Sequence, residues 1–208
     1  MNTHTVSEIS SAFPPVLLAV TGASGSIYSL KFMDIMKDAG QDVHLVFSET
    51  GAQVARYEIG DAACKKMERI AGKVYCPGDI SAPPSSGSNR WRAMVILPCT
   101  MGTLGAIANG VVRNLIHRAA DCCLKERMPL VIVPRETPLN RIHLENMLRL
   151  SDAGALIFPA MPCFYSRPGD IGELAFSLAA HVAELLGIEH QRRKPWQGFP
   201  GADEIREV

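Results

Sequence analysis

The sequence predicts a single α/β domain with a parallel, doubly wound sheet in a three-layer αβα arrangement. Five short apolar segments alternate with segments of helical periodicity along most of the chain. The chain has 208 residues, which is enough for one domain with a complete core. Several apolar segments run directly into small or hydroxyl residues, as strands do where a parallel sheet presents its ligand-binding edge.

The predicted strands are short apolar runs bounded by glycine, proline or polar residues. They cover residues 16–21, 43–47, 93–97, 130–133 and 155–158. Helical patterns fill the intervals over 27–39, from Ser48 to Gly60, from Asp61 onward, from 105 to 110, from 114 to Pro129, over 141–153 and from Asp170 to about 186. Ser48, Asp61 and Asp170 are the expected N-caps, with Glu173 completing a capping-box-like start. Right-handed crossovers would join the strands.

Charge and hydropathy exclude several classes of protein. Lysine plus arginine and aspartate plus glutamate both number 21, so the formal net charge is zero. This balance argues against a general nucleic-acid or acidic-membrane binder. No apolar run reaches about 18 residues, so we expect no membrane span. Residues 1–14 are expected to form a loose leader without a signal-peptide pattern, and residues 191–208 a polar tail.

The six cysteines indicate a reducing compartment. None of them forms a Cys-x-x-Cys pair, which gives no support to a zinc or disulfide-redox site. The simplest interpretation is reduced thiols used as small core residues in a cytoplasmic protein that needs no metal.

The first strand-to-helix junction favours a bound phosphate. After the strand at 16–21 comes a small-residue turn over 22–26, and then a helix. Backbone N–H groups at such a helix start face an anion, and Gly22 and Gly25 allow close approach. Ser24 and Ile27 occupy the second and third glycine positions of the dinucleotide fingerprint, so FMN suits the turn better than NAD. A plain tight βα turn is the alternative.

Two further junctions carry hydroxyl groups at the carboxyl ends of strands. Ser48 follows the strand at 43–47, while Thr100, Gly102 and Thr103 follow the strand at 93–97. Junctions that face one crevice make a cofactor site more probable than either junction alone would.

A second group of residues predicts an anion pocket. Arg118 and Lys125 are seven residues apart and therefore share a helix face. Arg135 and Glu136 follow the next strand, in a turn over 134–138 that begins and ends with proline. The Pro- and Ser-rich loop at 76–90 is interpreted as an ordered binding loop. The alternative is a solvated helix face followed by a surface turn.

Several motifs together resemble the flavin prenyltransferases of the UbiX type, long described as aromatic-acid decarboxylase subunits. The resemblance covers about residues 15–190. The motifs are TGASG at 21–25, APPSSGS at 82–88, PCTMGTL at 98–104, NL at 114–115 with RAAD at 118–121, LKER at 124–127, PRETP at 134–138, HLENM at 143–147 and FY at 164–165.

The resemblance implies a flavodoxin-like Rossmann fold and an enzyme that binds reduced FMN and dimethylallyl phosphate. This family joins the dimethylallyl group to N5 and C6 of the flavin and closes a fourth ring. The product, prenylated FMN, passes to a partner decarboxylase. The resemblance further implies a metal-independent reaction and assembly as a homododecamer.

The family's functional positions carry over to this sequence residue by residue. Those implied for FMN are Gly22, Ala23, Ser24, Ser48, Thr100, Met101, Gly102, Thr103 and Arg135. Those implied for the prenyl phosphate are Arg118, Lys125, Ser86, Gly87, Tyr165 and His181. Those implied for the chemical step are Glu136, Lys125, Arg118 and Glu58. His181 replaces the lysine or arginine that the family often has, so its imidazole would have to be protonated to hold phosphate.

Two alternative functions are also compatible with parts of the sequence. An FMN-dependent cysteine decarboxylase of related fold would need a catalytic histidine just after the first helix. His4 and His44 are the only candidates before His117, and neither has the expected context. A non-catalytic flavin carrier would not need an anion pocket with the residues Arg118, Lys125, Glu136 and Tyr165.

Overall fold

The chain folds around one six-stranded parallel sheet with the strand order β3-β2-β1-β4-β5-β6. The computed structural model describes residues 13–190 and residue 198, so residues 1–12 of the expected leader and nearly all of the expected tail lie outside it. The strands are β1 Val16–Val20, β2 Val43–Phe47, β3 Lys73–Tyr75, β4 Ala93–Cys99, β5 Leu130–Pro134 and β6 Leu156–Ile157.

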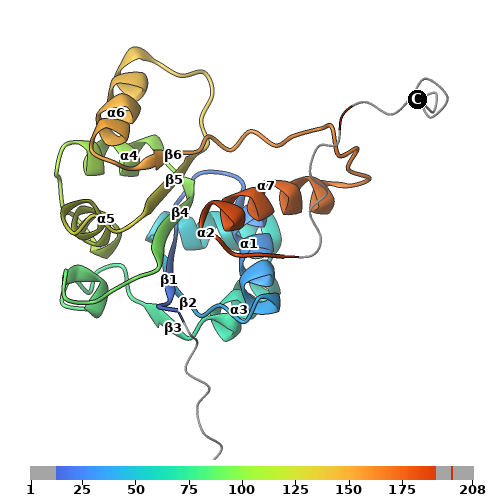
Figure 1. Ribbon diagram of the computed structural model, residues 1–208, viewed down its shortest axis with the longest axis horizontal. Helices are drawn as coiled ribbons and strands as arrows, with labels where there is room; N and C mark the ends of the chain where they lie inside the picture. The colour runs from blue at the N-terminus through green and yellow to red at the C-terminus, as the bar shows by residue number, and fades with distance from the viewer. Residues whose placement is uncertain (1–12, 191–197, 199–208) are drawn as a thin grey trace, which may run out of the picture.

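Helices cover both faces of this sheet, which confirms the predicted fold class (Figure 1). They are α1 Ser26–Asp38, α2 Glu49–Ile59, α3 Asp61–Ile70, α4 Met101–Ala108, α5 Leu115–Lys125, α6 Arg141–Asp152 and α7 Ile171–Leu185, with a 3-10 turn η1 Pro83–Ser85. Residues of α1, α2, α3 and α7 pack in one core, and residues of α4, α5 and α6 in the other. The winding reverses between β1 and β4, where an open α/β sheet binds its ligands. Without β3, the order is that of flavodoxin.

The sixth strand, β3, is the main correction to the predicted elements. It is three residues long and pairs only with β2, at the edge of the sheet. Lys73 and Val74 are exposed, so the segment has no apolar run that would distinguish it from a loop. Central strands are apolar throughout because helices cover both of their faces, whereas a short edge strand need not be.

Two of the three predicted N-caps are confirmed. The Ser48 hydroxyl accepts the Gly51 N–H at 2.9 Å, and the Asp170 carboxylate accepts the Glu173 N–H at 2.7 Å. The prediction for Asp61 is wrong because Gly60 is the N-cap of α3 and Asp61 is the first helical residue. An acidic side chain one position further in still favours the helix by its charge.

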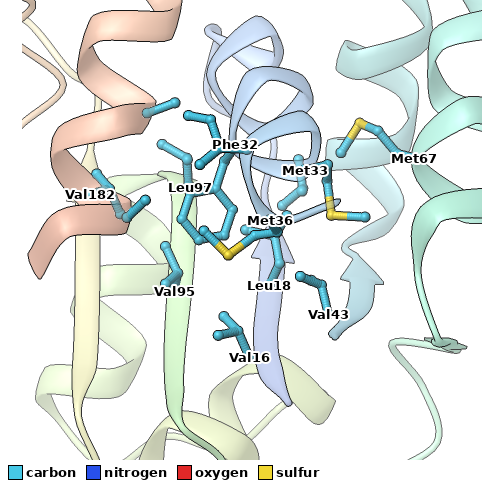
Figure 2. Close-up of a cluster of buried hydrophobic side chains, with 14 of the residues drawn as sticks. Val16, Leu18, Phe32, Met33, Met36, Val43, Met67, Val95, Leu97 and Val182 are labelled. Carbon is cyan, nitrogen blue, oxygen red and sulfur yellow. The ribbon is translucent and has the colours of Figure 1, made fainter. Parts of the chain in front are cut away.

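The core packs on both faces of β1, which makes the sheet a rigid base for the site. Val16 and Leu18 lie against α1, where Phe32, Met33 and Met36 are all completely buried (Figure 2). The alternate β1 residues pack toward α4 and α5. Every side chain of β1 is buried, so the turn that follows starts from a fixed point at the end of the strand. Within residues 13–190, no helix is long and apolar enough to cross a membrane.

Arg92, just before β4, bonds to two distant segments of the chain, and we predict that it stabilises the fold. Its guanidinium donates to the Leu186 carbonyl at 2.9 Å, the Gly187 carbonyl at 2.8 Å and the Gln41 side-chain oxygen at 2.7 Å. These bonds tie the end of α7 to the sheet. The substitution Arg92→Met keeps the apolar stem but leaves carbonyls without a charged donor, so the free energy of unfolding should fall by about 2 kcal/mol.

Urea denaturation would measure this loss. The matched control is Arg141→Met, which removes a guanidinium that is 90% exposed and paired with Glu145, so it should change stability by less than about 0.5 kcal/mol. Equal losses in the two variants would show that the Arg92 bonds add nothing to the fold.

Candidate functional site

The turns after β1 and β4 lie side by side because Thr21 bonds to both. Its hydroxyl donates to the Pro98 carbonyl at 2.8 Å and accepts the Thr100 N–H at 2.8 Å. Thr100 in turn caps α4, accepting the Thr103 N–H at 3.1 Å and donating to the Thr103 hydroxyl at 3.0 Å. The small-residue turn at 22–26 and the hydroxyl-bearing turn at 100–103 therefore form one continuous surface at the carboxyl edge of the sheet.

The start of α2 also reaches this edge, through glycines that permit close backbone contact. A Cβ on Gly22 would lie only 2.6 Å from the Thr50 Cγ2 atom. A Cβ on Gly51 would collide with the Val20 carbonyl oxygen and lie 2.9 Å from the Ser48 hydroxyl. Sequence reasoning did not single out Gly51. The available signal was a glycine three residues after the N-cap, where its low helix propensity makes it an unfavourable choice. Ser48 is thus placed beside the first turn.

Arg135 brings the end of β5 to the same place. Its Nε atom donates to the Ser24 carbonyl at 2.9 Å, across 111 positions of sequence. The structure thus gathers the residues expected for FMN at one edge of the sheet, around the reversal between β1 and β4. Glu136 follows Arg135 there as an exposed carboxylate, with its Oε1 accepting the Thr137 N–H at 3.0 Å.

Glu58, near the end of α2, supplies the anion at the start of α1. Its Oε2 atom accepts the Gly25 N–H at 2.9 Å and the Ser26 N–H at 2.8 Å. Helix α1 has no acidic residue in its first turn and no side-chain cap of its own, so this carboxylate takes that role. The sequence predicts a ligand phosphate at this helix start, but the Gly25 and Ser26 N–H groups hold a carboxylate of the chain.

The surroundings of Glu58 keep it ionised at neutral pH. Partial burial raises the pKa of this carboxyl, but hydrogen bonds from the Ser24 side chain and from the Ser26 and Gly25 backbone more than compensate, so the pKa of Glu58 is lowered from its ordinary value. The carboxylate therefore presents a permanent negative charge beside Ser24, suited to stabilising a nearby cation rather than to donating a proton.

This depressed pKa predicts a specific pH dependence. We expect Glu58→Gln to lower the free energy of unfolding by about 0.5–1 kcal/mol at pH 7, because the start of α1 loses its anion. Since the folded-state pKa is the lower one, this difference is complete above the unfolded-state pKa and disappears as pH falls through the folded-state value. Urea denaturation of both proteins at several pH values would show it. An exposed control, Glu68→Gln, should show no comparable trend.

The predicted cations lie on a second surface, where the loop at 76–90 packs against α5. Arg118 donates through Nε to the Ser85 carbonyl at 3.1 Å, and its Nη1 pairs with Asp121 at 2.6 Å. The Cys122 thiol donates to the same carbonyl at 3.0 Å. This anchoring places Ser86 next to the Arg118 side of the helix.

The other cation of this surface, Lys125, pairs with its neighbour Glu126. The hydrogen bond to Glu126 raises the pKa of Lys125, which therefore stays an ammonium. The Glu126 side chain also packs directly against Gly87, so that a Cβ there would displace it. One surface consequently carries Arg118, Lys125, Ser86 and Gly87. A phosphate that binds there would displace the carboxylates of Asp121 and Glu126 from the two cations.

Tyr165 and His181 lie elsewhere. They line a cavity of about 400 Å³ between α1, α7 and the segment at 163–172, together with Lys31 and Phe176. The His181 ring meets the Phe158 ring edge-on, with centroids 5.0 Å apart. Helix α7 packs on the α1 face of the sheet and α5 on the opposite face (Figure 1). A single chain therefore does not bring Tyr165 and His181 to Arg118 and Lys125.

The groups that the site offers to a ligand are backbone N–H groups, hydroxyl groups and charged side chains. Within residues 13–190, no three histidine, cysteine, aspartate or glutamate side chains come together in a way that would hold a metal ion. The arrangement is able to bind a flavin phosphate and ribityl chain with hydroxyls and N–H groups, and a second phosphate with cations.

A comparison with protein families defines the class of protein. The family model described as Flavoprotein matches residues 5–186, which is most of the chain. The chain belongs to the Flavoprotein family.

Individual relatives then define the group within that family. Flavin prenyltransferase UbiX of Methanothermobacter thermautotrophicus is 46% identical over 183 residues, covering 88% of this chain and 95% of that protein. The crystal structure of AnUbiX (PadA1) in complex with FMN and dimethylallyl pyrophosphate superimposes with a TM-score of 0.83 at 37% identity, covering 89% and 100% of the two chains. A dodecameric FMN-dependent UbiX-like decarboxylase from Escherichia coli O157:H7 gives 0.85 at 36%, covering 88% and 100%. These similarities make the chain a flavin prenyltransferase of the UbiX type.

The cysteine decarboxylases resemble the chain in fold alone. The FMN-dependent cysteine decarboxylase TvaF from thioviridamide biosynthesis superimposes with a TM-score of 0.56 at 17% identity, covering 80% of this chain and 98% of that one. The structure also assigns His44, one of the two histidines considered for that reaction, to the start of β2 and not to the carboxyl edge of the sheet. The alternative function is therefore not favoured.

Proposed function

We propose that the chain transfers a dimethylallyl group from dimethylallyl phosphate to N5 and C6 of reduced FMN, and that the prenylated FMN serves a partner decarboxylase. The observation that carries the proposal is the meeting of the β1, β4 and β5 ends at Thr21, Ser24, Thr100 and Arg135. That edge suits a mononucleotide flavin, and a protein 37% identical to this chain has been solved with FMN and a dimethylallyl donor.

In this proposal, the hydroxyl groups that cap helices hold the FMN. A hydroxyl that accepts a backbone N–H still has its own hydrogen to donate. Ser48 accepts the Gly51 N–H in this way, which leaves its O–H for a phosphate or ribityl oxygen. Thr103 receives the Thr100 O–H and can likewise donate its own. Gly22, Ala23, Met101 and Gly102 contribute backbone at the same edge, and Arg135 fixes the Ser24 turn from the other side.

The prenyl transfer itself requires charge in two places. When the bond from the prenyl carbon to the phosphate oxygen breaks, the electron pair leaves with the phosphate, so cations at Arg118 and Lys125 stabilise the leaving group. The prenyl carbon becomes electron-poor and takes an electron pair from flavin N5, with loss of the N5 proton. The fixed carboxylate of Glu58, whose pKa is depressed, supplies negative charge at the flavin edge.

Ring closure is the second step. A proton adds to the prenyl double bond, C6 of the flavin attacks the resulting cation, and C6 then loses a proton. One group that gives and later takes a proton satisfies both requirements, and we assign this role to Glu136. Its carboxylate lies next to Arg135, which contacts the Ser24 turn.

The phosphate site is completed by a second copy of the chain. Tyr165 and His181 lie on the α7 face of the sheet, opposite the α5 surface that carries Arg118 and Lys125. All four can surround one phosphate only if two copies meet, as subunits do in a closed oligomer. A dodecameric neighbour that is 36% identical supports such an assembly.

Subunit mixing tests this shared site. We expect Lys125→Ala and Tyr165→Ala each to lose most activity as a pure protein. When the two variants are co-expressed and assembled together, about a quarter of the sites should combine two intact halves, and a corresponding rate should return. Mixed assemblies no more active than the pure variants would show that each chain completes its own site. Two copies of Lys125→Ala, differing only in their affinity tag, are the control for assembly.

We infer the partner from the product of the reaction, and the cellular compartment from the state of the cysteines. A modified flavin made by a dedicated enzyme is used by another protein, here a decarboxylase. All six cysteines are free thiols, and four of them are buried, as is usual in the reducing cytoplasm.

Phosphate release tests the proposed function. Protein, FMN and dimethylallyl phosphate are mixed without oxygen, and inorganic phosphate is measured with the flavin either reduced or oxidised. A prenyltransferase releases about one phosphate per reduced flavin and very little with oxidised flavin. A flavin carrier releases none under either condition, and that result would overturn the proposal.

A further inference from the structure

His44 connects the two ends of the loop at 76–90. The loop begins after Tyr75, the last residue of β3, and ends before Trp91, which leads into β4. The Nδ1 atom of His44 lies 3.0 Å from the Tyr75 hydroxyl, and the two ring centroids are 5.6 Å apart. The His44 ring also meets the Trp91 ring at 5.2 Å, near perpendicular. One side chain of β2 therefore holds both ends.

The surroundings of His44 fix its orientation. The Nε2 atom lies 3.3 Å from the Asp42 carboxylate, so the neutral ring donates from Nε2 and accepts the Tyr75 O–H at Nδ1. Burial lowers the pKa of His44, which favours this neutral form. Tyr75 and Trp91 are each only 7% exposed, so the three rings form a packed unit rather than a surface contact.

The middle of the same loop rests on α5. The Ser85 carbonyl accepts from Arg118 at 3.1 Å, and near the start of the loop the Leu115 N–H donates to the Pro77 carbonyl at 2.8 Å. Ser86 and Gly87 follow directly, on the surface that carries Lys125. The loop is therefore fixed at its two ends by His44, and near its start and in its middle by α5. Releasing the ends of the loop would increase the conformational freedom of Ser86 and Gly87, which face the cations of α5.

We infer that His44 is a positioning residue for prenyl-phosphate binding: by joining Tyr75 to Trp91 it holds the loop so that Ser86 and Gly87 face the cations of α5. This inference rests on the proposed function for its effect on the reaction, but its effect on the loop does not. His44 itself lies at the start of β2, away from the carboxyl edge of the sheet, and acts through the loop alone.

Three variants separate this role from general stability. His44→Leu removes both ring nitrogens. His44→Asn places an amide oxygen near the former Nδ1 position and so retains an acceptor for the Tyr75 O–H. Val43→Ala is the matched control, because this neighbouring β2 side chain is buried in the opposite core, with α1. It weakens the strand without touching the loop.

Hydrogen exchange of the ligand-free proteins is the first readout. In His44→Leu, amides of residues 76–90 should exchange about tenfold faster than in the wild type, while His44→Asn restores most of the protection. In Val43→Ala, any increase should spread over the sheet rather than concentrate in the loop. Loop exchange in His44→Leu no faster than in Val43→Ala, or no recovery in His44→Asn, overturns the inference.

Steady-state kinetics are the second readout. For His44→Leu, KM for dimethylallyl phosphate should rise about tenfold, with kcat within about twofold and FMN affinity unchanged. A fall in kcat at unchanged KM would contradict a positioning role. If the wild type shows no turnover, the proposed function fails, and the exchange comparison still decides whether His44 orders the loop.

Discussion

Replacing Glu136 by glutamine is expected to stop the reaction after the bond to flavin N5 has formed. Glutamine keeps the size and hydrogen-bonding groups of glutamate, including an oxygen for the Thr137 N–H, but it neither gives nor takes a proton at neutral pH. The first bond needs a leaving phosphate and the N5 electron pair. Ring closure needs a proton to be added and another to be removed, so only that step should fail.

The size of this effect is large. General acid–base groups contribute about 10²–10⁴-fold to rate, so ring closure in Glu136→Gln should slow by roughly that factor while phosphate release is little changed. Stopped-flow spectra and mass analysis of quenched samples would show the singly attached flavin accumulating. The control is Glu145→Gln, an exposed carboxylate on α6 that pairs with Arg141. Ring closure at the normal rate in Glu136→Gln would remove Glu136 from the mechanism.

Replacing Ser24 by leucine should abolish flavin binding while the fold stays intact. Ser24 is exposed at the carboxyl edge, so a larger side chain meets no core atoms. It would instead project where the flavin is proposed to lie. The leucine also removes the Ser24 hydroxyl that lowers the Glu58 pKa. Steric exclusion from a preformed site costs far more than one hydrogen bond, so affinity should fall beyond detection.

The absorbance of bound flavin after gel filtration would measure this loss, and circular dichroism would check the fold. Ser24→Ala is the matched control, because it removes the hydroxyl without adding volume. It should retain most of the flavin, losing roughly 1 kcal/mol of binding free energy. If Ser24→Leu purifies with as much flavin as the wild type, the assignment of the turn is wrong.

The central strands and the cofactor edge were predictable because they depend on local pattern. The strands at 93–97 and 130–133 are continuous apolar runs, as strands covered on both faces must be. The residues that follow parallel strands meet at one edge, so Ser24, Ser48 and Thr100 could be placed together without knowledge of the contacts. Local pattern grouped Arg135 with Arg118 and Lys125 instead, and its contact with the Ser24 carbonyl emerged only from the structure. The short strand β3 escaped prediction because its packing, and not its pattern, makes it a strand.

The contacts that complete the site depend on tertiary structure. The pairing of Glu58 with the Gly25 and Ser26 N–H groups spans more than thirty positions, and no local pattern distinguishes Glu58 from a surface charge. The need for Gly51 arises from the nearby Val20 carbonyl, which belongs to another element. The separation of Tyr165 from Lys125 follows from the faces on which α7 and α5 pack. Family resemblance named these residues without giving that separation.

The mass of the flavin recovered from the reaction shows whether the protein prenylates FMN. Protein, reduced FMN and dimethylallyl phosphate are incubated without oxygen, the protein is removed, and the flavin is analysed by mass spectrometry. We expect a flavin heavier by one prenyl unit from the wild-type protein, and much less of this product from Lys125→Ala at saturating FMN. Recovery of unmodified FMN from the wild type, with donor still intact, would contradict this expectation.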